Sequence, residues 1–173
     1  MIIIVEGIDR VGKTTLCNKL KEELNIPIFK NERVCNRMLY NIEVELANQL
    51  TNFLSDVNCD VILDRFFYSE FVYGLADREY RNDFVLSLDE KLSKLNVLFI
   101  LVEPTDIDRS SDEHGKDLLL HKTLFDYCFD KSKIEHKIKV DYSTLDDAVN
   151  WVRRTMGIKV EDYGSCEDKQ SVE

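Results

Sequence analysis

The chain has 173 residues, a length that suits one domain with a full apolar core. Its 33 acidic residues outnumber its 23 lysines and arginines, and the formal net charge of −10 disfavours a nucleic-acid duplex or an anionic membrane surface as partner. A nucleotide remains compatible with this charge, because a phosphate site needs positive charge only locally.

The cysteines argue against a disulfide framework and against a zinc site. They are odd in number, widely scattered and never in C-x-x-C spacing, which is typical of reduced thiols in a cytosolic protein. They are Cys17, Cys35, Cys59, Cys128 and Cys166. Every apolar run is shorter than a membrane span, and the N-terminal run is too short for a signal peptide. We therefore predict a cytoplasmic protein.

A phosphate-binding loop is the strongest motif in the chain. Residues 7–14 fit G-x-x-x-x-G-K-[ST], and they lie between an apolar strand pattern over 2–5 and a helical pattern over 15–24. Glycine at both ends of the motif lets backbone N–H groups turn toward phosphate oxygens, while Lys13 offers a cation and Thr14 a hydroxyl for Mg²⁺. A glycine-containing turn with an incidental lysine is the alternative, which the flanking elements disfavour.

The predicted cofactors are therefore ATP and Mg²⁺, bound by this loop. The residues expected to bind the nucleotide are Gly7, Ile8, Asp9, Arg10, Val11, Gly12, Lys13, Thr14 and Thr15. Arg10 is close to the expected position of the terminal phosphate and can stabilise charge on the transferring group, but a solvated loop arginine explains it equally well.

Alternating strand and helix patterns follow along the rest of the chain. Continuous apolar runs predict strands over residues 26–29, 60–64, 97–102 and 138–141. Apolar residues at helical spacing predict helices over 37–55, 71–76, 84–95 and 118–130, and a last helix opened by a capping box at Ser143 to Asp146. Pro27 indicates either the start of its strand or an edge position in the sheet.

This pattern predicts an α/β fold with a parallel sheet covered on both faces, because its strands are apolar throughout. Ligands of such sheets gather at the carboxyl ends of the strands. The segments 7–14, 64–65 and 103–116 and the residue Asp141 all follow strand ends, so we expect them to meet at one crevice.

A second group of polar residues follows the strand over 60–64. Asp64 can hold Mg²⁺ through water or accept a proton, and Arg65 can grip a phosphate with two N–H groups. The aromatic residues Phe66, Phe67 and Tyr68 can stack on a base, and Ser69 follows them. A capping aspartate, a surface arginine and core aromatics are the alternative reading.

With Tyr73 and Gly74, these two motifs resemble the thymidylate kinase family, in the branch with an Asp-Arg pair in the phosphate loop and no arginine-rich lid. The resemblance implies a three-layer P-loop fold with five parallel strands, as in nucleoside monophosphate kinases, and a homodimer. It places Asp9 on the acceptor's sugar hydroxyl, Arg10 on the donor γ-phosphate, and Asp64 near Mg²⁺ and the acceptor.

By the same resemblance, Arg65 would bind the acceptor phosphate, with Tyr68, Ser69 and Tyr73 around the acceptor's base. Phe66 is a further predicted substrate-binding residue, as one of the aromatic side chains that can stack on a base. The predicted catalytic residues are Lys13, Arg10, Asp64 and Arg65, and the predicted metal ligands are Thr14 and Asp64.

The chain departs from that family in two places. The family's Arg-Glu-Pro-Gly stretch is replaced by residues 29–35, where Arg33 or the later Arg37 would have to supply the phosphate contact. The lid, at about 104–117, is short and acidic, with Arg109 and Lys116 as its evident cations. We predict one kinase domain over 1–156 and a disordered acidic tail over 157–173.

Three functions fit these residues. The leading hypothesis is ATP-dependent phosphoryl transfer to a nucleoside or deoxynucleoside monophosphate, most simply a thymidylate-like pyrimidine. A deoxynucleoside kinase would instead phosphorylate a neutral 5′-hydroxyl and would need Asp64 as base. A nucleotide-binding protein without acceptor chemistry is the third, although it leaves Arg10, Asp64 and Arg65 without a role.

Overall fold

The computed structural model describes residues 1–30, 40–56, 60–77, 84–105 and 117–158, which contain five strands and six α-helices. The strands are β1 (Ile2–Glu6), β2 (Ile28–Lys30), β3 (Val61–Asp64), β4 (Val97–Val102) and β5 (His136–Val140). The helices are α1 (Lys13–Leu24), α2 (Tyr40–Asp56), α3 (Phe67–Asp77), α4 (Phe84–Leu92), α5 (Leu118–Lys131) and α6 (Leu145–Thr155), and a 3₁₀ turn, η2 (Tyr142–Thr144), precedes α6.

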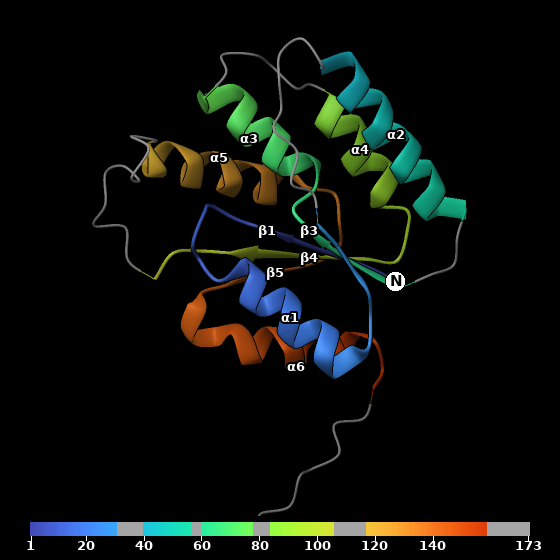
Figure 1. Cartoon of the computed structure of the whole chain (residues 1–173), viewed down its shortest axis with the longest axis vertical. Coiled ribbons are helices and arrows are strands. Elements are labelled where there is room, and N and C mark those ends of the chain that lie inside the picture. The colour runs from blue at the N-terminus through green and yellow to red at the C-terminus, as the bar shows by residue number, and fades with distance from the viewer. Residues whose placement is uncertain (31–39, 57–59, 78–83, 106–116, 159–173) are drawn as a thin grey trace, which may run out of the picture.

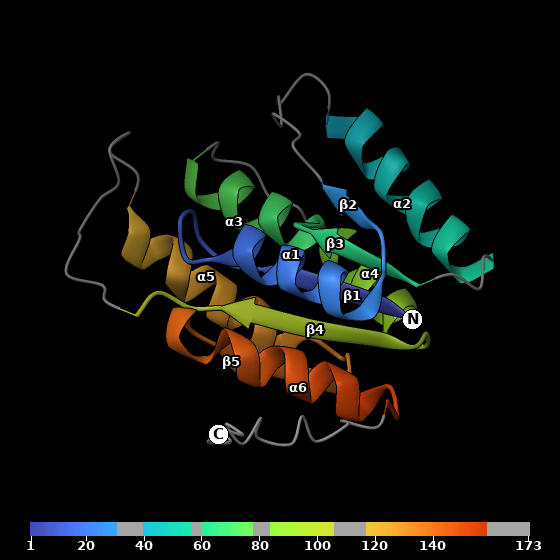
Figure 2. The ribbon, with the colours of Figure 1, turned by 60° about the horizontal axis from the view of Figure 1, so that its bottom comes forward.

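The strands form one parallel sheet in the order β2-β3-β1-β4-β5. Helices α1 and α6 pack together on one face, and α2, α3, α4 and α5 cover the other (Figures 1 and 2). Every residue of β1 and β4 is buried, because these central strands are covered on both sides. The predicted three-layer α/β fold is confirmed.

Strand register brings the functional segments to one edge of the sheet. Val5 is opposite Asp64, Glu6 is opposite Leu101, and Lys30 is opposite Asp64. The chain therefore leaves β1, β2 and β3 at the same level, where parallel sheets place their ligands. Figure 2 shows β2 at the border of the sheet, and Pro27 directly precedes its first residue, Ile28, in agreement with the strand start or edge position that Pro27 indicated.

The local structure differs from prediction at two helix starts. Helix α3 begins at Phe67, four residues before the predicted start at residue 71. The capping box forms between Asp141 and Thr144 rather than between Ser143 and Asp146. The Asp141 carboxylate accepts hydrogen bonds from the Ser143 and Thr144 amides and also from the Ser143 hydroxyl, so that hydroxyl does not cap α6.

Several predictions concern residues outside the described part of the chain. These are the contacts of Arg33 and Arg37, the lid cations Arg109 and Lys116, and the tail beyond residue 158. Among the described residues, no helix is both long enough and apolar enough to span a membrane.

Candidate functional site

The loop between β1 and α1 has the backbone of a phosphate cradle. Its φ angles are +142° at Gly7, +64° at Arg10 and +101° at Gly12. A Cβ on Gly7 would lie 2.2 Å from the carbonyl oxygen of Val102 on β4, and one on Gly12 would lie 2.7 Å from the ring of Tyr142. Glycine is required at both positions by backbone conformation and by space.

We expect Gly7→Ala to lower the free energy of unfolding by about 2 kcal/mol, since the new methyl group meets a backbone carbonyl that cannot rotate away. Urea unfolding would measure this. Gly157→Ala is the matched control, because Gly157 also has a positive φ, +70°, but nothing lies within 4 Å of its added Cβ. Equal losses in the two variants would show that close approach to β4 is unimportant.

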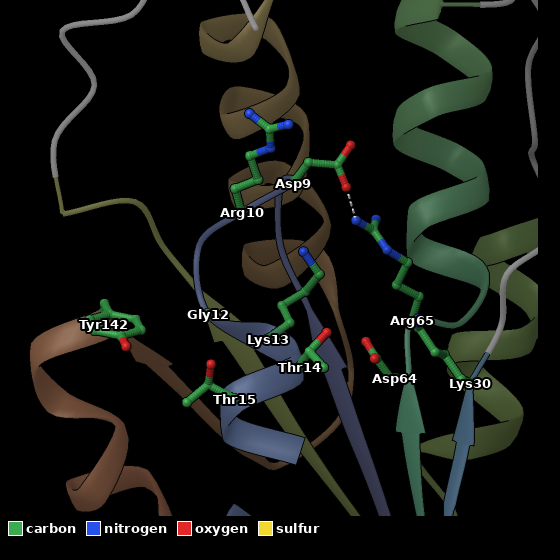
Figure 3. Close-up of a pocket in the computed structure, with 10 residues that line it drawn as sticks. All are labelled: Asp9, Arg10, Gly12, Lys13, Thr14, Thr15, Lys30, Asp64, Arg65 and Tyr142. Atoms are coloured by element: carbon green, nitrogen blue, oxygen red, sulfur yellow. Dashed lines mark hydrogen bonds and ion pairs between the residues drawn. The ribbon is translucent and has the colours of Figure 1, made fainter. Parts of the chain in front are cut away.

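A pocket of about 530 Å³ opens above this loop, at the carboxyl edge of the sheet (Figure 3). Its walls come from the phosphate loop and the start of α1, the ends of β2 and β3, and η2. The lining residues are Asp9, Arg10, Gly12, Lys13, Thr14, Thr15, Lys30, Asp64, Arg65 and Tyr142. Both predicted motifs therefore meet at one site.

Lys13 lies at the centre of the pocket and is only 6% exposed. Its amine donates a hydrogen bond to the carbonyl of Ile8 within the loop. Burial, together with the positive charge of Arg65, lowers the pKa of Lys13 to about 8. A bound polyphosphate would reverse this shift, because it brings opposite charge to the amine.

Arg65 faces the loop from the other side of the pocket. It has a φ of +66°, and its amide donates to the carbonyl of Val5 at 3.0 Å, which fixes the turn after β3. The guanidinium forms an ion pair with the Asp9 carboxylate and donates to the Tyr73 hydroxyl at 3.1 Å and to Ser69 Oγ at 3.3 Å. These contacts hold one cation between the phosphate loop and α3.

Two oxygen-bearing side chains line the same pocket as Lys13 and Arg65. Thr14 is exposed at the start of α1, and Asp64 ends β3 (Figure 3). A hydroxyl and a carboxylate in one pocket are the ligands that Mg²⁺ takes beside nucleotide phosphates, so this donor set fits the predicted metal. Arg10 extends from the loop away from Asp64 (Figure 3).

The other predicted nucleotide contacts lie behind the pocket wall. Ile8 and Val11 have buried side chains, so only the backbone of these residues is available to phosphate. Ser69 and Tyr73 do not line the pocket, but their hydroxyl oxygens accept hydrogen bonds from the guanidinium of Arg65, which does.

Phe66 and Tyr68 belong to the core, and their burial argues against the predicted contacts with the acceptor. They are 3% and 1% exposed. The Tyr68 ring stacks on Phe99 with a centroid distance of 4.5 Å, and its hydroxyl donates to Asp89. Because α3 starts at Phe67, Tyr68 lies in its first turn, and the Tyr68 ring packs on a residue of β4.

Asp141 and Glu103 were expected at the crevice but have supporting roles beside it. Asp141 caps η2, the turn that carries Tyr142. Glu103 forms ion pairs with Lys122 at 3.4 Å and Lys139 at 3.8 Å.

Lys30 and Tyr142 line the pocket without having been predicted to do so. Lys30 is the last residue of β2, and Tyr142 is 60% exposed in the turn after β5. Their positions just after strand patterns were the available signal, because every strand of a parallel sheet ends at the same edge.

No family model matches the chain. The YorR protein of Bacillus subtilis strain 168, an uncharacterized SPbeta prophage-derived protein, is 31% identical over 127 residues, which are 71% of this chain and 74% of YorR. The chain belongs to the YorR family.

The YorR family has the fold of the P-loop kinases. The crystal structure of YorR in complex with phosphorylated GDP matches this chain with a TM-score of 0.68 and 23% identity, covering 91% of this chain and 96% of that one. Deoxyadenosine kinase from M. mycoides matches with a TM-score of 0.53 and 12% identity, covering 91% and 98%.

Thymidylate kinase from Ehrlichia chaffeensis also matches with a TM-score of 0.53, at 18% identity, covering 90% and 98% of the two chains. Thymidylate kinase is thus one of several P-loop kinases with this architecture, and these similarities establish the fold that they share.

Proposed function

We propose that this YorR-family chain transfers a phosphoryl group from ATP to a nucleoside or deoxynucleoside monophosphate, with a thymidylate-like pyrimidine as the preferred acceptor. The observation that carries the proposal is the pairing of two cations across one pocket. Lys13 rises from the phosphate loop, and Arg65 faces it from the end of β3. One cation suits the donor phosphates and the other suits an anionic acceptor.

The chain's own groups supply positioning and charge. The loop amides and Lys13 bind the donor phosphates, and Arg65 orients the acceptor phosphate for in-line attack. Thr14 and Asp64 would hold Mg²⁺, which neutralises charge on the donor phosphates when it is bound. An acceptor that is already anionic needs no strong base, so Arg65 carries more of the catalysis than Asp64.

Tyr142 provides a platform for the donor base. Its ring lies over Gly12 at the start of α1, and much of it is exposed at the pocket wall. Stacking of a base on an aromatic side chain contributes roughly 1–3 kcal/mol to binding.

We therefore expect Tyr142→Ala to raise the KM for ATP by about 10-fold with little change in kcat. Steady-state kinetics with ATP as the varied substrate would measure the effect, and Tyr142→Phe should preserve the wild-type value. Tyr127→Ala is the control, because Tyr127 is 47% exposed on α5 and does not line this pocket. An unchanged KM for ATP in Tyr142→Ala would show that the Tyr142 ring does not contact the donor base.

A panel of acceptors tests the proposed function. Labelled ATP would be offered with nucleosides and their monophosphates, and GTP would be tested as a second donor because the YorR structure holds a guanine nucleotide. We expect transfer to monophosphates. Transfer to nucleosides alone would indicate a deoxynucleoside kinase, and ATP binding without any transfer would indicate a nucleotide-binding protein.

We further propose a homodimer, which the resemblance to thymidylate kinases implies, and a cytoplasmic location, which the odd and scattered cysteines indicate. Sedimentation equilibrium of the purified chain would test the association state, and a monomer at every concentration would exclude the dimer.

A further inference from the structure

Glu6 is a buried carboxylate that joins the phosphate loop to helix α3. It ends β1, directly before Gly7, and is 0% exposed. One carboxylate oxygen, Oε1, accepts from the Phe66 amide at 2.8 Å and from the Ser69 amide at 3.2 Å. The other, Oε2, accepts from the Ser69 hydroxyl at 2.5 Å. The strand before the loop is therefore tied to the first turn of α3.

The same serine continues the connection into the pocket. Ser69 Oγ accepts a hydrogen bond from Arg65 Nη1 at 3.3 Å, and Arg65 Nη2 pairs with Asp9. A serine hydroxyl has one proton and two lone pairs. Because that proton is donated to Glu6, a lone pair of the oxygen is available to Arg65.

We propose that Glu6 is a positioning residue for the acceptor phosphate: as a carboxylate, it orients the Ser69 hydroxyl so that the hydroxyl oxygen holds the Arg65 guanidinium toward the pocket. This inference rests on the proposed function and extends it. Glu6 is fully buried and touches no ligand itself, yet by this inference it affects how tightly the acceptor binds.

Protonation of Glu6 would reverse this hydrogen bond. The carboxylic acid would donate to Ser69 Oγ and would occupy one of its two lone pairs. The hydroxyl would then lack Glu6 as the acceptor that fixes its orientation, and its single remaining lone pair would no longer be held toward Arg65. Burial raises the pKa of Glu6 to about 7, and the bonds from Ser69 and Phe66 and the charge of Arg65 limit that rise. The carboxylate form is therefore gained as the pH rises through neutrality.

Other titratable groups face Glu6 from the elements packed around it. Lys13 and Cys17 lie on α1, Arg65 and Tyr73 on the β3–α3 side, and Cys128 on α5. Burial raises the pKa of both thiols well above the neutral range, and burial raises the pKa of Tyr73 to about 12. Of these five groups, only Lys13 has a pKa close to that of Glu6, about 8 against about 7. Lys13 faces the donor phosphates rather than the acceptor.

Glu6→Gln tests the proposal, because glutamine has the same shape and donates to Ser69 Oγ as the protonated acid would. The KM for the monophosphate acceptor and the KM for ATP would be measured across the neutral pH range. In the wild type we expect the acceptor KM to fall as the pH rises through about 7. In Glu6→Gln the acceptor KM should be about 10-fold higher than in the wild type at the higher pH. The fall in acceptor KM that Glu6 causes near pH 7 should be absent from this variant.

The acceptor phosphate itself titrates with a pKa of about 6. Its titration is common to both proteins and cancels in the ratio of their KM values. The KM for ATP should be the same in the two proteins.

Ser69→Ala keeps the carboxylate but removes the hydroxyl, and it should reproduce the loss of acceptor affinity. The double variant should be no weaker than either single variant, because both remove one connected path. Asp89→Asn is the matched control: Asp89 is also a buried carboxylate that accepts from Ser132 Oγ, at 2.6 Å, but it does not line the pocket that contains Arg65. It should lower stability and leave the pH profile of the acceptor KM unchanged.

A wild-type acceptor KM in Glu6→Gln would overturn the proposal, as would an equal rise in the KM for ATP. A wild-type protein that phosphorylates no monophosphate would overturn the proposed function, and this inference with it. The two failures are distinguishable, because the first leaves the wild-type enzyme active.

Discussion

Replacement of Lys13 by alanine should reduce the rate of phosphoryl transfer by about 10³-fold, the scale of effect seen when a charge-stabilising group is removed from a transferring phosphate. Lys13 is only 6% exposed, and its amine is held at the pocket by its hydrogen bond to the carbonyl of Ile8 in the loop. Initial rates with saturating ATP and acceptor would measure the loss.

Lys19→Ala is the control for this substitution. Lys19 lies on the same helix, α1, but it is exposed and pairs with Asp146 on α6 at 2.5 Å. Its removal should leave the rate unchanged. Near-normal turnover in Lys13→Ala, with the fold intact, would contradict the assignment of this loop as the donor site.

The pH dependence of donor binding should also report on Lys13. Its pKa in the unliganded protein is lowered to about 8, so the amine loses its proton as the pH rises through that value. Only the protonated amine attracts phosphate, and ATP affinity should therefore decline above about pH 8 in the wild type. Calorimetry in buffers with different ionisation enthalpies would detect the proton uptake, and Lys13→Ala should abolish it.

Local patterns in the sequence were sufficient for the fold and for half of the site. The apolar runs that became β1, β3 and β4 are continuous rather than alternating, which is typical of strands in a parallel sheet that is covered on both faces. Gly7 and Gly12 have backbone conformations that favour glycine, and Lys13 follows them at a fixed spacing. The loop could therefore be recognised from the local sequence alone.

The other half of the site depends on contacts between distant segments. Tyr68 looks like a base-stacking residue in the sequence, and only its packing on Phe99, 31 positions later, shows that it is core. Tyr142 approaches Gly12 through the pairing of β4 with β5, which no local pattern specifies. The connection from Glu6 to Arg65 likewise requires the β1–β3 register.

Arg65→Ala should raise the KM for a monophosphate acceptor by about 10²-fold, because a guanidinium that grips phosphate with two charge-assisted bonds contributes roughly 3 kcal/mol. The substitution keeps a Cβ at the position with a φ of +66°, so it removes the side chain without changing the backbone requirement. The KM for ATP should change little, since Arg65 faces the loop from the acceptor side.

Arg153→Ala provides a control of similar environment. The Arg153 side chain is 22% exposed, against 20% for Arg65, and it pairs with Glu23 at 3.4 Å on the face of the sheet covered by α1 and α6. Its loss should affect stability alone. Equal acceptor KM values in Arg65→Ala and in the wild type would show that Arg65 does not bind the acceptor phosphate.

Comparison of Arg65→Ala with Asp64→Asn separates the two kinds of kinase. A monophosphate acceptor brings its own negative charge, so it depends on the guanidinium, and Asp64→Asn should lower kcat through the metal without abolishing turnover. A nucleoside acceptor has to lose a hydroxyl proton, so it would depend on the carboxylate and hardly on Arg65. A larger loss of activity in Arg65→Ala than in Asp64→Asn would therefore indicate a monophosphate acceptor, and the reverse would indicate a nucleoside acceptor.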